Sequence, residues 1–441
     1  MQKPLIAVLL ASAFSLNAQA ADLIQVYQQA LANDATYASA RAAAAAGRER
    51  ITQGRSGLLP TVGVSGDITK SNNDFTAWNN SPALGGGTNL RTTDIQVTLQ
   101  QPLFRWDRWE TYQQSKLLQA ISEAQFAQAQ QDLITRVSQA YFDVLAAQDT
   151  LESTRAQKVA VTEQLASAKR NFEVGTQTIT DTHEAQAAYD LVVSQEIAAV
   201  NDLETKKTAL QAIIGTPPAT LATLRTGVTL TAPQPINVDQ WVSAAENQNY
   251  AVTVAQLQLE SAKRDISKNR AGHLPTLDLV ASSLHRDVNG QTVQSGKTNS
   301  NSIGIQYSIP IFSGFAVTSK VRESIALEDK ARNDLEANRR NAALVARQSF
   351  LGVNSGLAQV KALEAAEVSS NSALESNKLG YQVGVRINID VLNAQRQLYQ
   401  TRTDLARARY NTILAGLKLK AAAGSLREED LQPINALLQQ P

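Results

Sequence analysis

The fold is decided by the stretch YQVGVRINIDVLNAQ, residues 381–395, and by a related stretch, FEVGTQTITDTHEAQ, at residues 172–186. Both begin with an aromatic residue followed by x-Val-Gly, and both then have Asp and Gln at the same spacing. Glycine costs a helix about 1 kcal/mol relative to alanine, and the β-branched residues around it disfavour helix further. Since long helical patterns flank each stretch, both are predicted to be turns of helical hairpins, and their recurrence predicts a duplicated unit.

The composition narrows the class of protein. The 441 residues include no cysteine, which excludes disulfides, thiolate metal sites and a cysteine nucleophile. The net charge of +1 argues against a nucleic-acid partner, because such proteins usually carry a basic face. Residues 1–20 are predicted to be a signal peptide, with Lys3, an apolar core at residues 5–14 and a small-x-small cleavage motif at residues 18–20. No later stretch contains about 18 consecutive apolar residues, so no transmembrane helix is expected.

The mature chain is predicted to contain two structural repeats, residues 21–237 and 238–423, and a C-terminal tail, residues 424–441, with no strong pattern. Each repeat has the order helix, two strands, long helix, turn, shorter helix. Helices are expected at residues 22–57, 181–214, 238–270, 314–380 and 390–423, with a further long helix of about 68 residues that ends near residue 171. A proline-rich insert is expected at residues 215–239.

Four short strands are predicted from apolar and polar residues that alternate. They lie at residues 61–69, 94–100, 276–282 and 302–308. In the first strand, for example, Val62, Val64 and Ile68 share one face. Polar loops, rich in glycine in the first case, are expected between the members of each pair, at residues 71–91 and 286–300.

Helix lengths suggest how the elements are arranged. A helix of about 68 residues is about 100 Å long. The two short helices of a repeat together match the long one, so they are expected to stack end to end beside it. This arrangement places the strands at one end of a rod and the Val-Gly turns at the other.

The strands have the length and period of transmembrane β-strands, although a half-buried soluble sheet has the same alternation. The signal peptide and the polar loops favour the membrane. So do aromatic residues just after the strands, which suit a membrane interface: Phe104, Trp106, Trp109 and Phe312. Four strands are too few to close a barrel, and the smallest barrels have about eight. Oligomerisation is therefore expected, with two copies giving 8 strands and three giving 12.

The chain resembles the TolC-type outer-membrane efflux protein family over nearly all of its mature length. The resemblance lies in Leu-Pro-Thr at residues 59–61 and 274–276, Pro-x-Phe at residues 102–104 and 310–312, and the motif at residues 381–393. It implies a homotrimer that forms a 12-stranded β-barrel in the lipid of the outer membrane and a long α-helical barrel across the periplasm. It also implies partners, namely a periplasmic adaptor protein and an inner-membrane pump or ABC exporter.

The resemblance implies a gate at the turns. Tyr381 and Arg386 match family residues that latch the closed tip, and Thr180 and Asp181 of the first turn are their expected partners. In this interpretation Tyr381 bonds to Asp181, and Arg386 contacts Thr180 or a nearby carboxylate. The alternative for Tyr381 is an aromatic that only packs in the hairpin, like Phe172.

Asp390 has two compatible interpretations. It can cap the helix that follows the turn and complement the helix dipole. It can also point into the pore, where three copies form an anionic constriction that selects cations. The family commonly has a second acid three residues later, and this chain has Asn393 there, so weaker cation selectivity is expected.

The tips themselves are the expected adaptor-docking points. The resemblance assigns this role to Val-Gly in each turn, at residues 174–175 and 383–384, namely Val174, Gly175, Val383 and Gly384. The alternative is that the glycines serve only the turn.

No catalytic or metal site is predicted. His183, His273 and His285 fall in separate elements without metal-ligand spacing, and no nucleophile–base pair is apparent. The predicted function is a passive exit duct without cofactors, used for efflux, type I secretion or both. The alternative is a non-conducting, periplasm-spanning scaffold or adhesin.

Overall fold

The computed structural model describes residues 20–75, 86–225, 227–290 and 295–439. The chain forms two compact units. The helical unit comprises Met1–Ala42, Gln125–Thr253 and Ala337–Pro441, and the sheet unit comprises Ala43–Ala124 and Val254–Glu336. The predicted signal peptide, apart from Ala20, lies outside the described residues.

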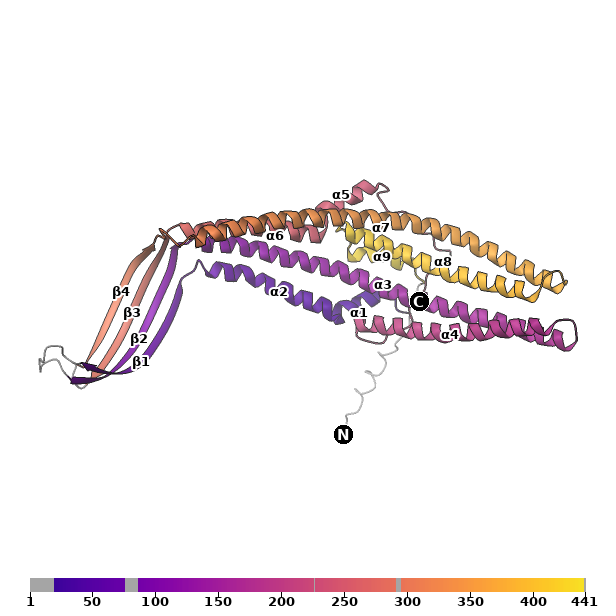
Figure 1. Cartoon of the computed structure of the whole chain (residues 1–441), viewed down its shortest axis with the longest axis horizontal. Coiled ribbons are helices and arrows are strands. Elements are labelled where there is room, and N and C mark those ends of the chain that lie inside the picture. Colours follow the sequence, from indigo (N-terminus) through magenta and orange to yellow (C-terminus); the bar gives the residue numbers. More distant parts are fainter. Residues whose placement is uncertain (1–19, 76–85, 226, 291–294, 440–441) are drawn as a thin grey trace, which may run out of the picture. The chain divides into compact units, whose positions relative to one another are not determined.

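The sheet unit contains one four-stranded antiparallel sheet. Its strands, β1 (Thr61–Phe75), β2 (Gly86–Phe104), β3 (Thr276–Gly290) and β4 (Gly296–Ser308), lie side by side in the order of the chain (Figure 1). The strand prediction is therefore confirmed in number. The middle pair, β2 and β3, joins strands from the two halves of the sequence.

The register places aliphatic residues of all four strands on one face. Val62 pairs with Leu99, Leu99 with Ala281, and Ala281 with Ile303. Successive side chains of a strand alternate between faces, so the neighbouring positions present polar residues on the other face. Among the described residues, the aliphatic face is open at both edge strands, where Val62 and Ile303 are 66% and 76% exposed.

The strands are longer than predicted, and most of the two expected loops is strand. Asn72 pairs with Asn89 inside the predicted loop at residues 71–91, and Val288 pairs with Gly296 inside that at residues 286–300. Residues 76–85 and 291–294 of these loops lie outside the described residues. The alternation that marks a strand stops where both faces become polar, but backbone pairing needs no side-chain pattern and continues.

The remaining elements are helical, and two of them are very long. They are α1 (Leu23–Asn33), α2 (Ala35–Ser56), α3 (Trp106–Glu173), α4 (Ile179–Ile214), α5 (Val238–Gln248), α6 (Tyr250–Arg270), η1 (Ala271–His273), α7 (Ala316–Gln382), α8 (Asn388–Ala422), η2 (Glu428–Asp430) and α9 (Leu431–Asn435). Within the described part of the chain, none of these helices has the length and apolarity needed to cross a membrane.

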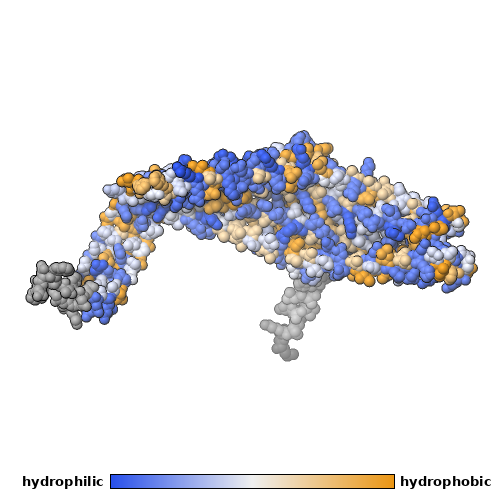
Figure 2. Space-filling view, viewed as in Figure 1, coloured by the Kyte–Doolittle hydropathy of each residue, from blue (hydrophilic) through white to orange (hydrophobic). Residues whose placement is uncertain are grey.

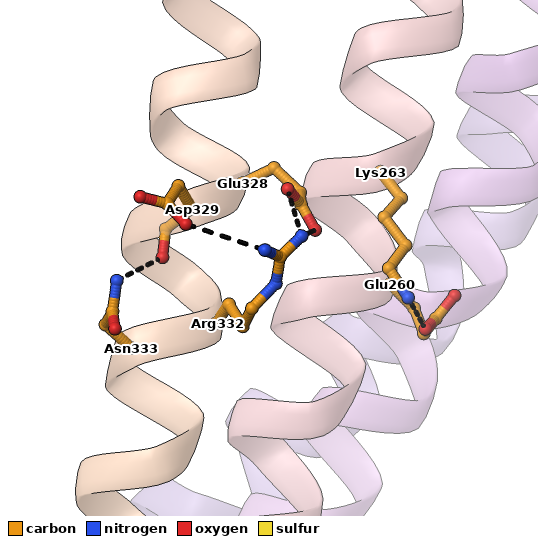
Figure 3. Close-up of polar contacts among 6 residues, drawn as sticks. All are labelled: Glu260, Lys263, Glu328, Asp329, Arg332 and Asn333. Carbon is orange, nitrogen blue, oxygen red and sulfur yellow. Dashed lines mark hydrogen bonds and ion pairs between the residues drawn. The ribbon is translucent and has the colours of Figure 1, made fainter.

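In the sheet unit, several ion pairs join residues of one helix. On α7, Arg332 lies 2.8 Å from Glu328 and 3.6 Å from Asp329, and on α6, Lys263 lies 2.7 Å from Glu260 (Figure 3). Pairs three or four residues apart stabilise an isolated helix by about 0.2–0.5 kcal/mol. These contacts therefore support the helices themselves.

The helical unit contains two hairpins, α3–α4 and α7–α8 (Figure 1). Its main apolar core takes residues from α1, α3, α4, α8 and the C-terminal segment. The largest fully buried side chains of the core come from α1, α3, α4 and the C-terminal segment: Leu23, Leu133, Tyr141, Phe142, Leu145, Leu210, Leu431 and Leu438. Each such side chain contributes about 1.5–3 kcal/mol when it leaves water. This core stabilises the part of the helical unit from which the hairpins extend to their turns.

Two predicted helices are each broken into two. The helix expected at residues 22–57 ends at Asn33 and restarts at Ala35, and the one expected at residues 238–270 ends at Gln248 and restarts at Tyr250. The residue at each break has an extended backbone and a side chain that accepts a hydrogen bond from the next helix: Asp34 from the Tyr37 N–H (2.6 Å) and Asn249 from the Ala251 N–H (2.9 Å). Asp and Asn favour such local bonds, which compete with a continuous helix.

The C-terminal segment is more ordered than its sequence indicates. Leu431 and Leu438 are fully buried, and the Gln439 N–H donates to the Thr223 carbonyl (2.7 Å). The absence of a strong sequence pattern in this tail therefore does not prevent it from packing in the core. The segment is too short for periodicity to reveal that it fills the core.

Candidate functional site

The two turns have the same backbone. In the first, the Thr176 N–H donates to Asn171 O (2.8 Å) and the Gly175 N–H to Phe172 O (2.9 Å); in the second, Val385 donates to Gly380 O (2.9 Å) and Gly384 to Tyr381 O (3.1 Å). This pair of bonds is the Schellman motif that ends many helices. It requires positive φ at the glycines, 77° and 80°, which glycine adopts without a Cβ penalty. The prediction of two hairpin turns is confirmed.

The first turn caps its own following helix. Thr178 is the N-cap of α4, and its side chain accepts from the Asp181 N–H (3.3 Å) while Asp181 accepts from the Thr178 N–H (3.1 Å). This reciprocal arrangement is a capping box. Asp181 is the second member of this box, and α4 begins at Ile179, two residues before the predicted helix start at residue 181.

The second turn has no side-chain cap. Its N-cap residue is Ile387, which offers no acceptor, and Asp390 lies in the first turn of α8. Asp390 pairs instead with Arg386, at 3.7 Å. The interpretation that Asp390 caps α8 through a hydrogen bond is therefore wrong. An acid in the first turn of a helix still complements the helix dipole.

One of the two expected latch residues has a partner other than the predicted one. The hydroxyl of Tyr381 accepts a hydrogen bond from the side-chain amide of Gln177, whereas a bond to Asp181 was expected. Arg386 lies 3.7 Å from the carboxylate of Asp390 in its own turn, which agrees with the expected contact to Thr180 or a nearby carboxylate. Within one chain, the hydrogen bond between Gln177 of the first turn and Tyr381 of the second therefore joins the two turns. Gln177 occupies in the first turn the position that Arg386 occupies in the second.

Asn393 is exposed one turn after Asp390, and its side-chain oxygen accepts a hydrogen bond from Arg396 (3.1 Å). It carries no charge of its own. The only carboxylate in the motif at residues 381–395 is therefore that of Asp390.

A tip residue that sequence reasoning missed is Asn388, the first residue of α8. It is fully buried, and its amide bonds both to Gln164 of α3 (2.6 Å) and to the carbonyl of Asp181 in α4 (3.0 Å). A signal existed in the repeat, because the equivalent residue of the first turn is the aliphatic Ile179. A buried asparagine in place of an exposed isoleucine indicates a role specific to the second turn.

The tips expose aliphatic side chains. Val174 of the first turn is 72% exposed, and Val383, Val385 and Ile387 of the second are exposed by more than half. Figure 2 shows hydrophobic residues on the surface at the end of the helical unit formed by the turns. Gly175 and Gly384, beside these valines, have open space around them, since an added Cβ would have no neighbour within 4 Å.

The ends of β2 and β4 expose a second set of apolar side chains. Phe104, Trp106 and Trp109 are each about two-fifths exposed, and Phe312 is 74% exposed. They follow directly on the aliphatic face of the sheet. Large exposed apolar surfaces of this kind mark contacts with a membrane or another protein.

Metal-binding chemistry finds no support in the described ranges, where no group of three or more His, Asp or Glu side chains could hold an ion. His183 lies in α4, His273 in η1 and His285 in β3. The two turns and the exposed face of the sheet are therefore the candidate functional regions of the described residues.

These features agree with a family known from sequence. The family model described as "Outer membrane efflux protein" matches residues 26–216 and 241–425, which together make up most of the chain. The chain belongs to this family. Its match covers both turns and all four strands.

Individual members of the outer membrane efflux protein family match over nearly the full length. "Outer membrane protein TolC" of Escherichia coli (strain K12) is 34% identical, with 99% of this chain and 89% of that protein covered. "Proteases secretion protein PrtF" of Dickeya chrysanthemi is 31% identical, with 98% and 95% covered. Among solved structures, the outer membrane protein VceC of Vibrio cholerae has a TM-score of 0.76 at 18% identity, covering 91% of this chain and 96% of that one, which shows the shared fold.

Proposed function

We propose that the chain is the protomer of a homotrimeric exit duct in the outer membrane that extends into the periplasm. The exposed aliphatic face of the sheet carries this proposal, because it has the alternation of strands that face lipid. Each edge strand of the sheet, β1 and β4, has a partner on one side within the described residues. Unpaired strand edges are not tolerated in lipid, so neighbouring copies complete the barrel. Three copies give 12 strands, the number that membership of the family implies.

The turns act as the gate of this duct. Tyr381 with Gln177 and Arg386 with Asp390 hold the second turn in place, and in the trimer Thr180 and Asp181 of the first turn face Arg386. Hydrogen bonds of this kind contribute about 0.5–1.5 kcal/mol each, and more when one partner is charged. A docking partner can reverse such a bias by binding the open state more tightly.

Asp390 supplies the charge of the constriction. Three copies around the axis form one anionic ring, and Asn393 adds no second ring. Arg386, at 3.7 Å, offsets part of the charge of Asp390 while the second turn is held closed. The ring therefore attracts cations most strongly when Arg386 moves away.

A periplasmic adaptor protein docks at the exposed tips, at Val174 and Gly175 in the first turn and Val383 and Gly384 in the second. The energy for transport comes from an inner-membrane pump or ABC exporter that works through this adaptor. The duct itself has no catalytic activity and no cofactor. The name of the Dickeya relative refers to protease secretion, which supports type I secretion alongside small-molecule efflux.

Conductance across planar lipid bilayers tests the duct against the alternative of a non-conducting scaffold or adhesin. Wild-type protein is expected to show a small conductance, and the double variant Tyr381→Phe/Arg386→Ser a several-fold larger one. A double variant that inserts as a folded trimer and still carries no current would refute the duct. Deletion of the gene, followed by drug-sensitivity assays and analysis of secreted proteins, then separates efflux from secretion.

A further inference from the structure

Asn388 differs from the other polar residues of the second turn in its burial. Its relative exposure is 0%, whereas the side chains of Arg386 and Asp390 are 58% and 33% exposed. It lies next to an apolar cluster of α3, α4 and α8 that includes Leu165 and Leu392. An amide in such a place is stable only while its hydrogen bonds are made.

Both ends of the Asn388 amide are used, and each end reaches a different helix. The side-chain amide of Gln164 in α3 donates to Asn388 Oδ1 at 2.6 Å, and Asn388 Nδ2 donates to the carbonyl oxygen of Asp181 in α4 at 3.0 Å. One side chain therefore connects the first turn of α8 to both helices of the other hairpin. All of these residues belong to the helical unit.

The equivalent position in the first turn shows that the fold does not require this residue. Ile179 has the same place at the start of α4, is 46% exposed and takes part in no such bridge. The helix start there is held by the capping box of Thr178 and Asp181. In the second turn the cap is missing, and the bridge through Asn388 is what fixes the beginning of α8.

We propose that Asn388 is a positioning residue of the gate, which holds the start of α8 against the α3–α4 hairpin and must be released before the second turn can move. This inference rests on the proposed gated duct. Release leaves the amides of Asn388 and Gln164 without partners beside an apolar surface, which disfavours the separated state. A partner that docks at the tip therefore has to compensate for these two bonds in addition to those of Tyr381 and Arg386.

The test uses full-length trimers in planar bilayers and compares Asn388→Leu, Gln164→Leu and their combination with wild type. Leucine has the branched outline of asparagine but no amide, so it removes the bonds. We expect Asn388→Leu to raise the mean conductance about tenfold, which corresponds to about 1.4 kcal/mol in the gating equilibrium. Gln164→Leu is expected to have a smaller effect, and the combination less than the product of the two, because the two residues share one bond.

Two controls make the result decisive. Asn411→Leu changes an exposed asparagine of the same helix, farther along α8 from the turn, and is expected to leave the conductance unchanged. Thermal unfolding and trimer migration establish that each variant is folded, and Gln164→Leu, at a half-buried position, provides the test if Asn388→Leu does not assemble.

The outcomes separate the inference from the function on which it rests. Folded variants at both positions with wild-type conductance, beside an open Tyr381→Phe/Arg386→Ser trimer, would overturn the role of Asn388 and leave the duct intact. Effects of the two substitutions that simply multiply would also overturn it, since the bond would then not be shared. Absence of current from every variant, including Tyr381→Phe/Arg386→Ser, would overturn the duct itself.

Discussion

The two turns of the helical unit have one backbone and two ways of stabilising it. Both end a helix with a Schellman motif around glycine. The first turn then begins the next helix with its own capping box, Thr178 and Asp181, whereas the second begins with an uncapped Ile387 and depends on Asn388, Arg386 and Asp390. A turn held by its own cap stays formed when its neighbours move. A turn held by bonds to other helices can be released, which suits a moving part.

The helix breaks in the two halves of the chain also differ, in the charge of the residue at the break. Asp34 accepts two hydrogen bonds from the guanidinium of Arg136, at 3.0 and 3.1 Å. At the equivalent break, Asn249 is neutral and donates to the carbonyl of Ala422 at 2.9 Å. One break thus depends on an ion pair in which the side chain of the acid, Asp34, is only 4% exposed. The other depends on hydrogen bonds of a neutral amide.

The largest effect is expected from removal of the charged break. Asp34→Ala removes both bonds to Arg136 and the acceptor for the Tyr37 N–H, and we expect a loss of about 3 kcal/mol in the free energy of unfolding. Asn249→Ala removes only neutral bonds and is expected to cost about 1–2 kcal/mol. Chemical unfolding of the two variants in detergent, followed by circular dichroism, measures both. Equal losses would show that the charge contributes nothing beyond the cap.

The break at Asp34 also predicts a dependence on pH. Burial acts to raise the pKa of Asp34, but the hydrogen bonds from Arg136 and from the Tyr37 N–H outweigh it and hold the pKa below its ordinary value. The stability that Asp34 contributes is therefore fully present above the unfolded pKa of about 4 and is lost as the pH falls through the folded pKa.

Thermal unfolding between pH 7 and pH 3 tests this dependence. The fall in the unfolding temperature toward acid should be smaller in Asp34→Asn than in wild type, because the amide does not titrate. Asn249→Asp makes the reverse change, because it places a titratable carboxyl group at the neutral break. Parallel curves for wild type and Asp34→Asn would assign the acid sensitivity to other carboxylates.

A smaller effect is expected at the caps. Thr178→Ala removes the N-cap acceptor of α4 and should cost about 1 kcal/mol, seen as faster amide hydrogen exchange at the start of that helix. Ile387→Thr introduces the missing cap into the second turn and should slow exchange at the start of α8. If Ile387→Thr leaves exchange unchanged, the bonds of Asn388 already hold that helix start and a cap adds nothing.

The smallest effect on stability is expected at Asp390. Its pair with Arg386 is partly exposed, so Asp390→Asn should change the free energy of unfolding by less than about 1 kcal/mol. The same substitution should abolish the preference of the channel for cations, measured as the reversal potential in a salt gradient. Unchanged ion selectivity would mean that Asp390 only pairs with Arg386 and does not face the pore.

Local patterns predicted much of the fold. The Val-Gly turns were predictable because their positive φ favours glycine, which is visible in a short stretch of sequence. The exposed face of the sheet was predictable because side chains of a strand point to opposite faces in turn, so its apolar residues recur at every second position. The resemblance of the motif at residues 381–393 to a known family agrees with the family match over most of the chain. The limits of the repeats, residues 21–237 and 238–423, remain predictions, as do the roles of the tip residues.

Other features were decided only by the tertiary structure. The strand ends were missed because backbone pairing continues beyond the alternating pattern, and the breaks at Asp34 and Asn249 were missed because a single capping side chain interrupts an otherwise helical sequence. The partners of Tyr381 and Asn388 lie more than 200 residues away along the chain. The sequence by itself thus determined the type of backbone that most segments adopt, since that depends on neighbouring residues, but not where each strand or helix ends. Which side chains meet depends on how distant helices pack, and only the folded chain brings Gln164, Asp181 and Asn388 together.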